Sequence, residues 1–254
     1  MAGKPHYRRH TYTYGGSRSG LLAPGRILCL IPSPIHQVTM NLHLPYIPEL
    51  DTCTTADEIS TLLENRGQRQ SIASLNWPDL YDYMPLTSFT AAHSGRFIYI
   101  DFFVRCNYLR AENYTPLSPV SQDSCVEFFV SPTSDNHYWN FEFNCIGAIN
   151  ASHRSERSNP TRLTPEELGT IRVSPSCGTR PFREMEGIFS WNLLVAIPLE
   201  LIGVEYKGEP IEMTANFNKC ASATSAPHYL SWNPIDSEKP DFHRPDCFGH
   251  ITLD

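Results

Sequence analysis

Hydrophobic and polar residues alternate with a period of two between Asp123 and Asn144, in the stretch DSCVEFFVSPTSDNHYWNFEFN. Two apolar rows result, and their members are Val126, Phe128 and Val130, then Trp139, Phe141, Phe143 and Cys145. Successive side chains of a strand point to opposite faces, so each row predicts a strand with one face on a core. Residues 131–136 separate the rows and are rich in turn formers. The pattern therefore predicts a β-hairpin.

The opposite face of this hairpin is polar. It carries Glu127 on the first strand and Tyr138, Asn140, Glu142 and Asn144 on the second. Carboxylates, amides and a phenol are suited to an uncharged hydrophilic ligand such as a sugar, because they donate and accept hydrogen bonds. A solvated outer sheet face has the same composition. The pattern alone leaves both interpretations open.

Similar alternation recurs along the chain and predicts strands at 81–89, 97–104, 170–173, 188–197 and 211–217. Capping boxes at 55–58 and 164–167 predict a helix that ends before Gly67 and a single helical turn, and a further turn is predicted at 198–203. Many short strands with few helices are typical of an all-β fold. We predict an antiparallel β-sandwich, jelly-roll-like, with a few short helical turns.

The first 39 residues differ from the rest in charge. Residues 1–39 carry five basic and no acidic residues, a net charge of +5, while the whole chain carries −7, so residues 40–254 carry −12. No apolar stretch there is typical of a signal peptide. We expect residues 1–39 to be a disordered extension, either a leader resembling a transit peptide or an upstream extension of a reading frame that begins at Met40. Residues 40–254 are expected to form the domain.

Composition excludes several classes of protein. The acidic body disfavours nucleic acid as a partner, because that affinity depends on neutralising phosphates. No apolar run approaches the roughly 20 residues of a membrane span. The eight cysteines form no CxxC pair, and buried, reduced thiols favour a reducing compartment such as the cytoplasm, with secretion as the alternative. The sequence does not determine the oligomeric state.

Several segments in a fixed order resemble a known family. The most specific are the D-S-x-V-E-x-F strand at 123–129, the W-x-x-x-x-A-I-P strand at 191–198, and the ending that begins S-W-N-P at 231–234 and closes with F-G at 248–249. From about residue 51 to 254 the chain resembles the family 9 carbohydrate-binding modules and their stand-alone bacterial relatives. The resemblance implies a β-sandwich that holds a saccharide at one face without catalysis.

The resemblance also implies particular site residues. Family members hold a sugar ring between two tryptophans surrounded by carboxylate, arginine and amide groups. Trp232 corresponds to one tryptophan and Glu127 to the carboxylate, while Asn216 or Asn218 corresponds to the amide. Glu142 stands at the position of the arginine, and no aromatic residue occupies the position of the second tryptophan, within 119–122.

We therefore expect non-catalytic, weak binding of an oligo- or polysaccharide. Glu127, Glu142 and Asn216 would share a face with Trp232 and Tyr229 at its rim, and a single stacking aromatic predicts dissociation constants of about 0.1–1 mM. Trp232 is equally consistent with a core residue that seals the sandwich. Two alternative functions are a glycoside hydrolase that uses Glu127 and Glu142 as its carboxylate pair, and a protein-interaction scaffold.

Metal binding is the remaining question. The resemblance implies that structural calcium accompanies some family members, without naming its ligands in this chain. His228, Asp241, His243 and Asp246 lie near the C-terminus, but their spacing matches no regular arrangement of ligands for a transition metal. A polar loop is the favoured interpretation of these four residues.

Overall fold

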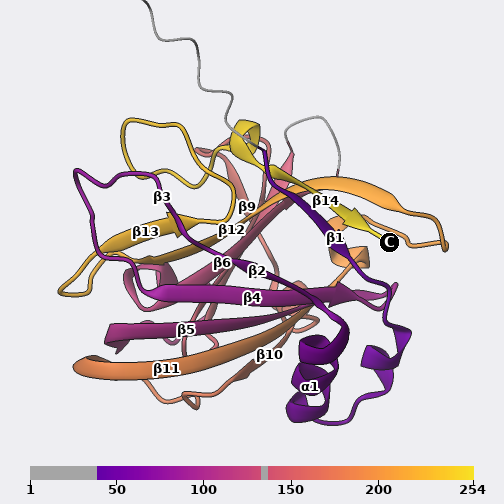
Figure 1. Ribbon diagram of the computed structural model, residues 1–254, viewed down its shortest axis with the longest axis horizontal. Coiled ribbons are helices and arrows are strands. Elements are labelled where there is room, and N and C mark those ends of the chain that lie inside the picture. Colours follow the sequence, from indigo (N-terminus) through magenta and orange to yellow (C-terminus); the bar gives the residue numbers. More distant parts are fainter. Residues whose placement is uncertain (1–38, 133–136) are drawn as a thin grey trace, which may run out of the picture. The chain divides into compact units, whose positions relative to one another are not determined.

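The computed structural model describes residues 39–132 and 137–254, and Figure 1 shows two β-sheets in this part of the chain. The predicted extension at 1–39 lies outside the described residues except for Thr39, as do turn residues 133–136. The predicted sandwich is confirmed. No helix among the described residues is both long and apolar enough to cross a membrane.

The larger sheet has nine strands. They are β1 (Asn41–Leu44), β3 (Ser74–Leu75), β6 (Cys125–Ser131), β7 (Tyr138–Asn144), β8 (Ile149–Arg154), β9 (Pro160–Arg162), β12 (Ile211–Ala221), β13 (His228–Ser231) and β14 (Gly249–Leu253). Their order is β1-β14-β12-β6-β7-β8-β9, with β13 beside β12 and β3 beside β13. The predicted hairpin β6–β7 is therefore central, as expected.

The smaller sheet has five strands in the order β10-β11-β5-β4-β2. They are β2 (Gln68–Ser71), β4 (Leu86–His93), β5 (Phe97–Ala111), β10 (Arg172–Pro175) and β11 (Phe182–Pro198). Every pairing between these described strands is antiparallel, and in the larger sheet only β1 and β14 run parallel. The parallel pair is a departure from the predicted antiparallel sandwich.

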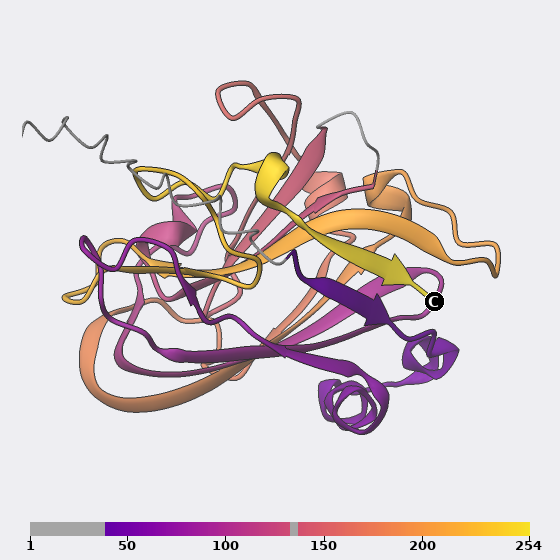
Figure 2. The same ribbon diagram turned by 45° about the horizontal axis from the view of Figure 1, so that its top comes forward.

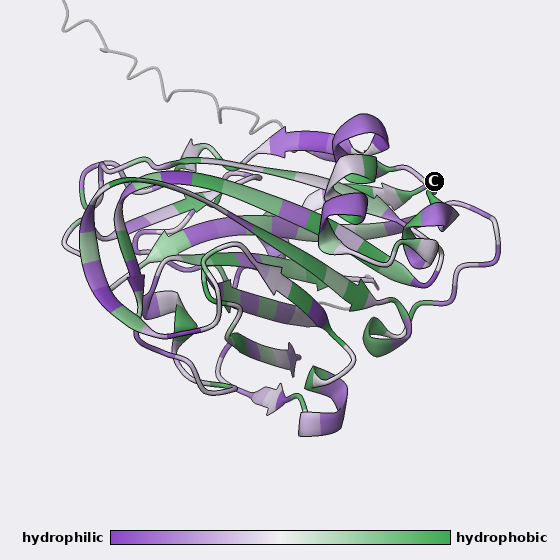
Figure 3. Cartoon of the chain, turned by 90° about the horizontal axis from the view of Figure 1, so that it is seen from below, coloured by the Kyte–Doolittle hydropathy of each residue, from purple (hydrophilic) through white to green (hydrophobic). Residues whose placement is uncertain are grey.

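The main core lies between the two sheets. The predicted inward residues Phe128, Phe141 and Phe143 are fully buried. Phe217 of β12 stacks on Phe89 of β4 with ring centroids 3.7 Å apart, which joins the sheets. Figure 3 shows the hydrophobic and hydrophilic residues that alternate along such strands. Each fully buried aromatic or aliphatic side chain contributes about 1.5–3 kcal/mol to folding.

Trp139 departs from the predicted inward row. It is only partly buried, although it packs against the main core. Its indole stacks on His153 of the neighbouring strand β8, with centroids 4.1 Å apart. Trp139 pairs with Val130 at the end of the β6–β7 ladder.

Two α-helices begin at the predicted capping boxes. They are α1 (Ala56–Arg66) and α2 (Pro165–Leu168). In both, the threonine side chain and the glutamate three residues later exchange hydrogen bonds with free backbone N–H groups. Single 3₁₀ turns occur at η1 (Pro48–Thr52), η2 (Val120–Gln122), η3 (Glu200–Ile202) and η4 (Pro245–Cys247). Helix α1 contributes Leu63 to a small cluster on the outer face of the five-stranded sheet, and it lies below the strands in Figures 1 and 2.

The outer face of the nine-stranded sheet is covered by irregular segments of the chain, a feature that the sequence did not lead us to expect. Residues 233–248 form most of the segment between β13 and β14, and this segment contributes Ile235, Phe242 and Phe248 to a second apolar cluster. Trp77 joins the same cluster from the segment after β3. The polar side of the β6–β7 hairpin is consequently buried beneath these residues and does not face solvent.

Candidate functional site

Four polar side chains form a row across the outer face of the nine-stranded sheet. Strand register places Asn218 of β12 opposite Glu127 of β6, Glu127 opposite Glu142 of β7, and Glu142 opposite Asn150 of β8. Their side chains meet because directly opposite residues of antiparallel strands share a face. We call Asn218, Glu127, Glu142 and Asn150 the polar row.

Amide groups hold both carboxylates of the polar row. Asn150 Nδ2 donates to Glu142 Oε2 at 2.9 Å, and Asn140 Nδ2 donates to Glu142 Oε1 at 3.0 Å. Asn218 Nδ2 donates to Glu127 Oε2 at 3.4 Å. The two carboxyl groups are therefore fixed in position before any ligand arrives, which lowers the entropy cost of binding one.

Burial makes both carboxyl groups hold a proton more strongly than usual. Glu127 is 2% and Glu142 is 6% exposed. Burial, followed by the negative charge of Cys220 and of Glu142, raises the pKa of Glu127 well above its usual range. Burial also raises the pKa of Glu142, although Asn150, Arg154 and Asn140 oppose that effect. A protonated carboxyl group can donate a hydrogen bond as well as accept one.

A cavity of about 130 Å³ lies over the polar row. It is lined by Glu127 and Glu142 of the polar row, by Pro240, Asp241, Phe242 and His243 of the covering segment, and by Ser121, Phe129, Arg157, Cys220 and Tyr229. Tyr229 is in edge contact with Tyr81, with ring centroids 4.9 Å apart. We call this space the outer-face cavity.

Ion pairs and hydrogen bonds hold the walls of the outer-face cavity. Arg157 Nη1 lies 3.1 Å from Asp241 Oδ2. The hydroxyl of Tyr138 and Nδ1 of His243 are 3.0 Å apart. Burial, together with the positive charge of Arg154 and Arg157, lowers the pKa of His243 to about 3. The imidazole is accordingly neutral at neutral pH.

Trp232 does not lie at the rim of this site, contrary to the position expected for a stacking residue. It is 2% exposed and belongs to the main core, where its ring meets Phe217 edge to face at 5.7 Å. Leu230 is also in this core. Because side chains two residues apart in a strand share a face, Trp232 continues the inward row that Leu230 begins.

Of the other expected residues, Tyr229 lines the cavity, whereas Asn216 and Asn218 form hydrogen bonds in the structure around it. Tyr229 lines the outer-face cavity together with Glu127 and Glu142. Asn216 is buried and bonds the backbone after β13, because its Nδ2 donates to Asn233 O at 3.0 Å and its Oδ1 accepts from Asn233 N at 2.9 Å. Asn218 is buried against Glu127. Asn216 and Asn218 therefore do not line the cavity.

The sequence reasoning did not identify Arg157, Asp241, Phe242 or His243 as residues of one cavity. They lie in irregular segments, where no period in the sequence signals which side chains come together. Of the four C-terminal residues considered for a metal, each has a separate partner. Asp241 pairs with Arg157, His243 with Tyr138, Asp246 with Arg244, and His228 with Lys219.

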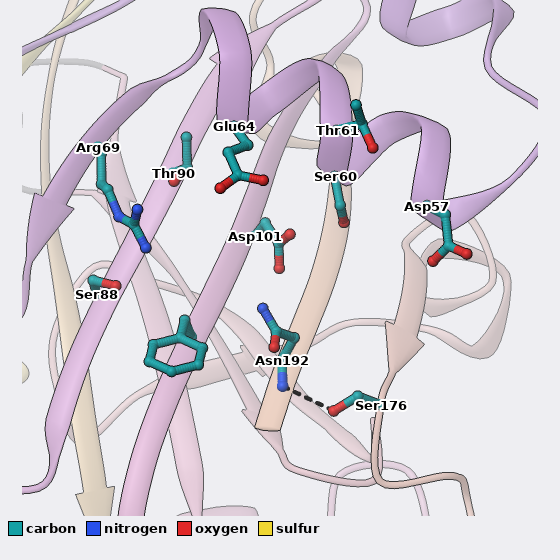
Figure 4. Close-up of a pocket in the computed structure, with 11 residues that line it drawn as sticks. Asp57, Ser60, Thr61, Glu64, Arg69, Ser88, Thr90, Asp101, Ser176 and Asn192 are labelled. Carbon is teal, nitrogen blue, oxygen red and sulfur yellow. Dashed lines mark hydrogen bonds between the residues drawn. The ribbon is translucent and has the colours of Figure 1, made fainter. Parts of the chain in front are cut away.

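A larger groove lies on the opposite side of the molecule, between α1 and the outer face of the five-stranded sheet (Figure 4). Its volume is about 530 Å³, and it is lined by Asp57, Ser60, Thr61, Glu64, Arg69, Ser88, Thr90, Asp101, Phe103, Ser176 and Asn192. Burial raises the pKa of Asp101, while Ser60 and Asn192 lower it. The sequence reasoning missed this groove, although Asp101 interrupts the apolar run of β5. We call it the α1 groove.

The calcium implied by the resemblance is not matched by a cluster of three carboxylates within the residues that the structure describes. Within residues 39–132 and 137–254, one group of three or more His, Cys, Asp or Glu side chains has its ligand atoms within 4.8 Å of one another. That group is Cys125, Glu127 and Cys220. Two sulfur ligands do not suit Ca²⁺, which takes oxygen ligands.

Comparisons with known proteins agree with this architecture. The model of the family described as carbohydrate-binding family 9 matches residues 57–253. A solved structure from Bacteroides uniformis, described as a candidate carbohydrate-binding protein, is 33% identical, with a TM-score of 0.78, over 85% of this chain and 100% of its own. No curated protein matches the chain.

Two more distant structures share the fold. Both are family 9 carbohydrate-binding modules from Caldicellulosiruptor kristjanssonii, one in complex with glucose and one with cellotriose. They are 13% and 12% identical, with TM-scores of 0.53 and 0.52. The matches cover 85% and 84% of this chain and 96% and 92% of the modules. From its sequence and its fold, this chain belongs to carbohydrate-binding family 9.

Proposed function

We propose that this protein binds a saccharide, without catalysis, at the outer-face cavity. The observation that carries the proposal is the position of Glu127 and Glu142 at the floor of that cavity, opposite each other and below the rings of Tyr229 and Phe242. Sugar hydroxyls pair with carboxyl groups, and the C–H face of a sugar ring packs on an aromatic ring. The family 9 modules in complex with glucose and cellotriose support the same class of ligand.

The size of the cavity supports weak binding of one end of a sugar chain. Small-molecule sites usually enclose about 300–1,000 Å³, whereas this cavity measures about 130 Å³. A single ring can enter only in part, unless Pro240, Phe242 and neighbouring wall residues move apart. With Trp232 in the core, Phe129, Tyr229 and Phe242 are the phenyl and phenol rings that line the cavity, and dissociation constants of about 0.1–1 mM remain our expectation.

Binding is favoured over hydrolysis for physical reasons. A glycoside hydrolase needs one protonated and one ionised carboxyl group on either side of the bond it cleaves. Burial here raises the pKa of both Glu127 and Glu142, and asparagine side chains hold both groups. The small cavity also leaves no room for the two sugar units that flank a glycosidic bond.

The proposal is tested by titrating the full chain with glucose, cellotriose and a panel of soluble oligosaccharides, using NMR or calorimetry. Glu142→Gln and Tyr229→Ala should each weaken binding about tenfold, the loss of about 1.4 kcal/mol expected for one good contact. Asp101→Asn and Phe103→Ala in the α1 groove are matched controls and should bind like the parent protein. Thermal melting of each variant reports whether its fold is intact.

Opposite results would overturn the proposal. If only the α1-groove variants lose binding, the saccharide binds beside α1 and not at the outer-face cavity. Absence of binding to every sugar tested, together with recovery of a stoichiometric protein partner, would favour the interaction scaffold. Release of reducing ends that disappears in both Glu127→Gln and Glu142→Gln would establish hydrolysis instead.

A further inference from the structure

Two cysteines and a glutamate meet beneath the outer-face cavity. Cys125 of β6 lies directly opposite Cys220 of β12, and Glu127 lies two residues beyond Cys125 on the same face. Oε1 of Glu127 is 3.2 Å from Sγ of Cys220 and 3.9 Å from Sγ of Cys125. All three side chains are buried, and their ligand atoms lie within 4.8 Å of one another. Each comes from one of two adjacent central strands, so the backbone fixes their spacing.

We propose that Cys125, Glu127 and Cys220 form a binding site for a thiophilic divalent cation of the zinc class. Zinc binds thiolate sulfur at about 2.3 Å and carboxylate oxygen at about 2.1 Å, so sulfur and oxygen at two corners of a tetrahedral site are about 3.6 Å apart. The two sulfur–oxygen distances here, 3.2 and 3.9 Å, lie on either side of that value. Small side-chain rotations therefore suffice to form the site.

The donor set determines the class of metal. Two thiolates and one carboxylate suit Zn²⁺ and chemically similar soft or borderline cations, whereas Ca²⁺ and Mg²⁺ require oxygen ligands. Cys220 and Glu127 also line the outer-face cavity. The fourth position of a tetrahedral metal thus has an approach from the cavity, where a water molecule can occupy it.

The local charges are compatible with a cation. Cys125, Glu127 and Cys220 are all buried, so three acidic groups share a space from which water is largely excluded. A divalent cation would replace their three protons on binding. The nearby ammonium of Lys219 is engaged elsewhere, because its Nζ donates to the backbone carbonyl of Cys220 at 2.7 Å and lies 2.9 Å from His228 Nε2.

This site goes beyond saccharide binding, although it shares Glu127 with the outer-face cavity. The metal would use Oε1 of Glu127 and leave Glu142 and Tyr229 for a sugar. Its test needs no saccharide, so failure of the metal site and failure of the proposed function are distinguishable.

The test uses the full chain, reduced and stripped of metal, and titrated with Co²⁺ as a spectroscopic probe. A single equivalent of Co²⁺ should produce thiolate-to-cobalt charge-transfer absorption and the intense visible bands of a tetrahedral site, and Zn²⁺ should abolish both by displacement. Cys125→Ser and Cys220→Ser should each lose the charge-transfer band. Glu127→Gln should retain the band but bind Co²⁺ more weakly. Cys106→Ser, a buried cysteine outside the cluster, is the matched control and should retain the full spectrum.

A second measurement keeps the proposal falsifiable if a cysteine variant fails to fold. Zn²⁺ should raise the melting temperature of the parent protein and of Cys106→Ser, because binding to the folded state alone stabilises it. Glu127→Gln should show a smaller rise. Absence of both the cobalt spectrum and the zinc-dependent rise would overturn the proposal. So would mass-spectrometric evidence that Cys125 and Cys220 are joined as a disulfide in the protein as isolated.

Discussion

The two faces of the nine-stranded sheet are both buried, but different kinds of side chain fill them. The inner face packs Phe128, Phe141 and Phe217 against the five-stranded sheet. The outer face carries Glu127 and Glu142, with asparagines and cysteines around them, beneath the covering segments. The same strands supply both faces, because their side chains alternate.

The difference shows which face folding requires and which face function can use. Apolar contacts are non-directional, and each adds to stability with the area it removes from water. A buried carboxyl group instead costs stability unless hydrogen bonds or a ligand compensate for lost hydration. The outer face holds such groups at the centre of the sheet, where apolar residues would be more stabilising. This arrangement supports assigning binding to the outer face and stability to the inner face.

Truncating a ring on each face gives the largest expected effect. Phe217→Ala should lower the free energy of unfolding by about 3–5 kcal/mol. Phe217 stacks on Phe89 and contacts Phe128, and the two sheets around it cannot move together to fill the space that its ring leaves. Phe129→Ala removes the same ring from the outer face and should cost less, since the covering segments can settle into the space. Chemical denaturation of both variants measures the difference. Equal losses would show that the outer cluster is as rigid as the inner core.

Removing a buried amide from the outer face should lower the free energy of unfolding, because the hydrogen bonds of that amide are lost. Asn216→Leu keeps the volume but leaves the backbone N–H of Asn233 without its acceptor. We expect a loss of about 2 kcal/mol in the free energy of unfolding, the cost of an unsatisfied buried donor. Gln68→Leu replaces an exposed amide on β2 of the other sheet, and as the control it should change stability by less than about 0.5 kcal/mol. An unchanged Asn216→Leu would mean that the outer face tolerates apolar replacement.

Overpacking the inner face next to Trp232 should have an effect of similar or smaller size. A Cβ atom on Gly249 would lie 2.5 Å from Cζ3 of Trp232 and 3.0 Å from the carbonyl oxygen of Met40. Gly249→Ala should therefore lower the free energy of unfolding by about 1–3 kcal/mol. Gly169→Ala is the milder control, because its φ is negative and its added Cβ atom would lie 3.3 Å from the carbonyl oxygens of Pro165 and Glu166, a tight contact but a looser one than at Gly249. A neutral Gly249→Ala would imply that Trp232 moves freely and is not held in the core.

Sequence alternation predicted the hairpin β6–β7 and its two faces because a strand's period is local. It did not predict that the outer face is covered, since the covering residues Ile235 and Phe242 lie in an irregular segment far along the chain. The same alternation, which places Leu230 in the core, indicates that Trp232 also faces the core, but the resemblance favoured a rim position. The pairing of Cys125 with Cys220 depends on the register of two strands distant in sequence, which a period cannot specify.

Acidification should lower the free energy of unfolding through His243, which lies in the segment that covers the outer face. This is the smallest effect that we predict. The pKa of His243 is lowered to about 3 in the folded protein, while an unfolded histidine titrates near about 6.5. Between these values the unfolded chain binds more protons than the folded one, so stability falls as pH decreases. We expect a loss of about 1 kcal/mol between about pH 7 and pH 5.5 from this residue.

Urea denaturation at several pH values measures this effect as the difference between the parent protein and His243→Asn. The variant should lose less stability on acidification, because it has no imidazole to protonate beside Arg154 and Arg157. His250→Asn, an exposed position on β14, is the control and should follow the parent protein. If His243→Asn and the parent show the same pH dependence, the segment around His243 already opens in the folded protein, and the contrast between a fixed inner face and a covered outer face would have to be revised.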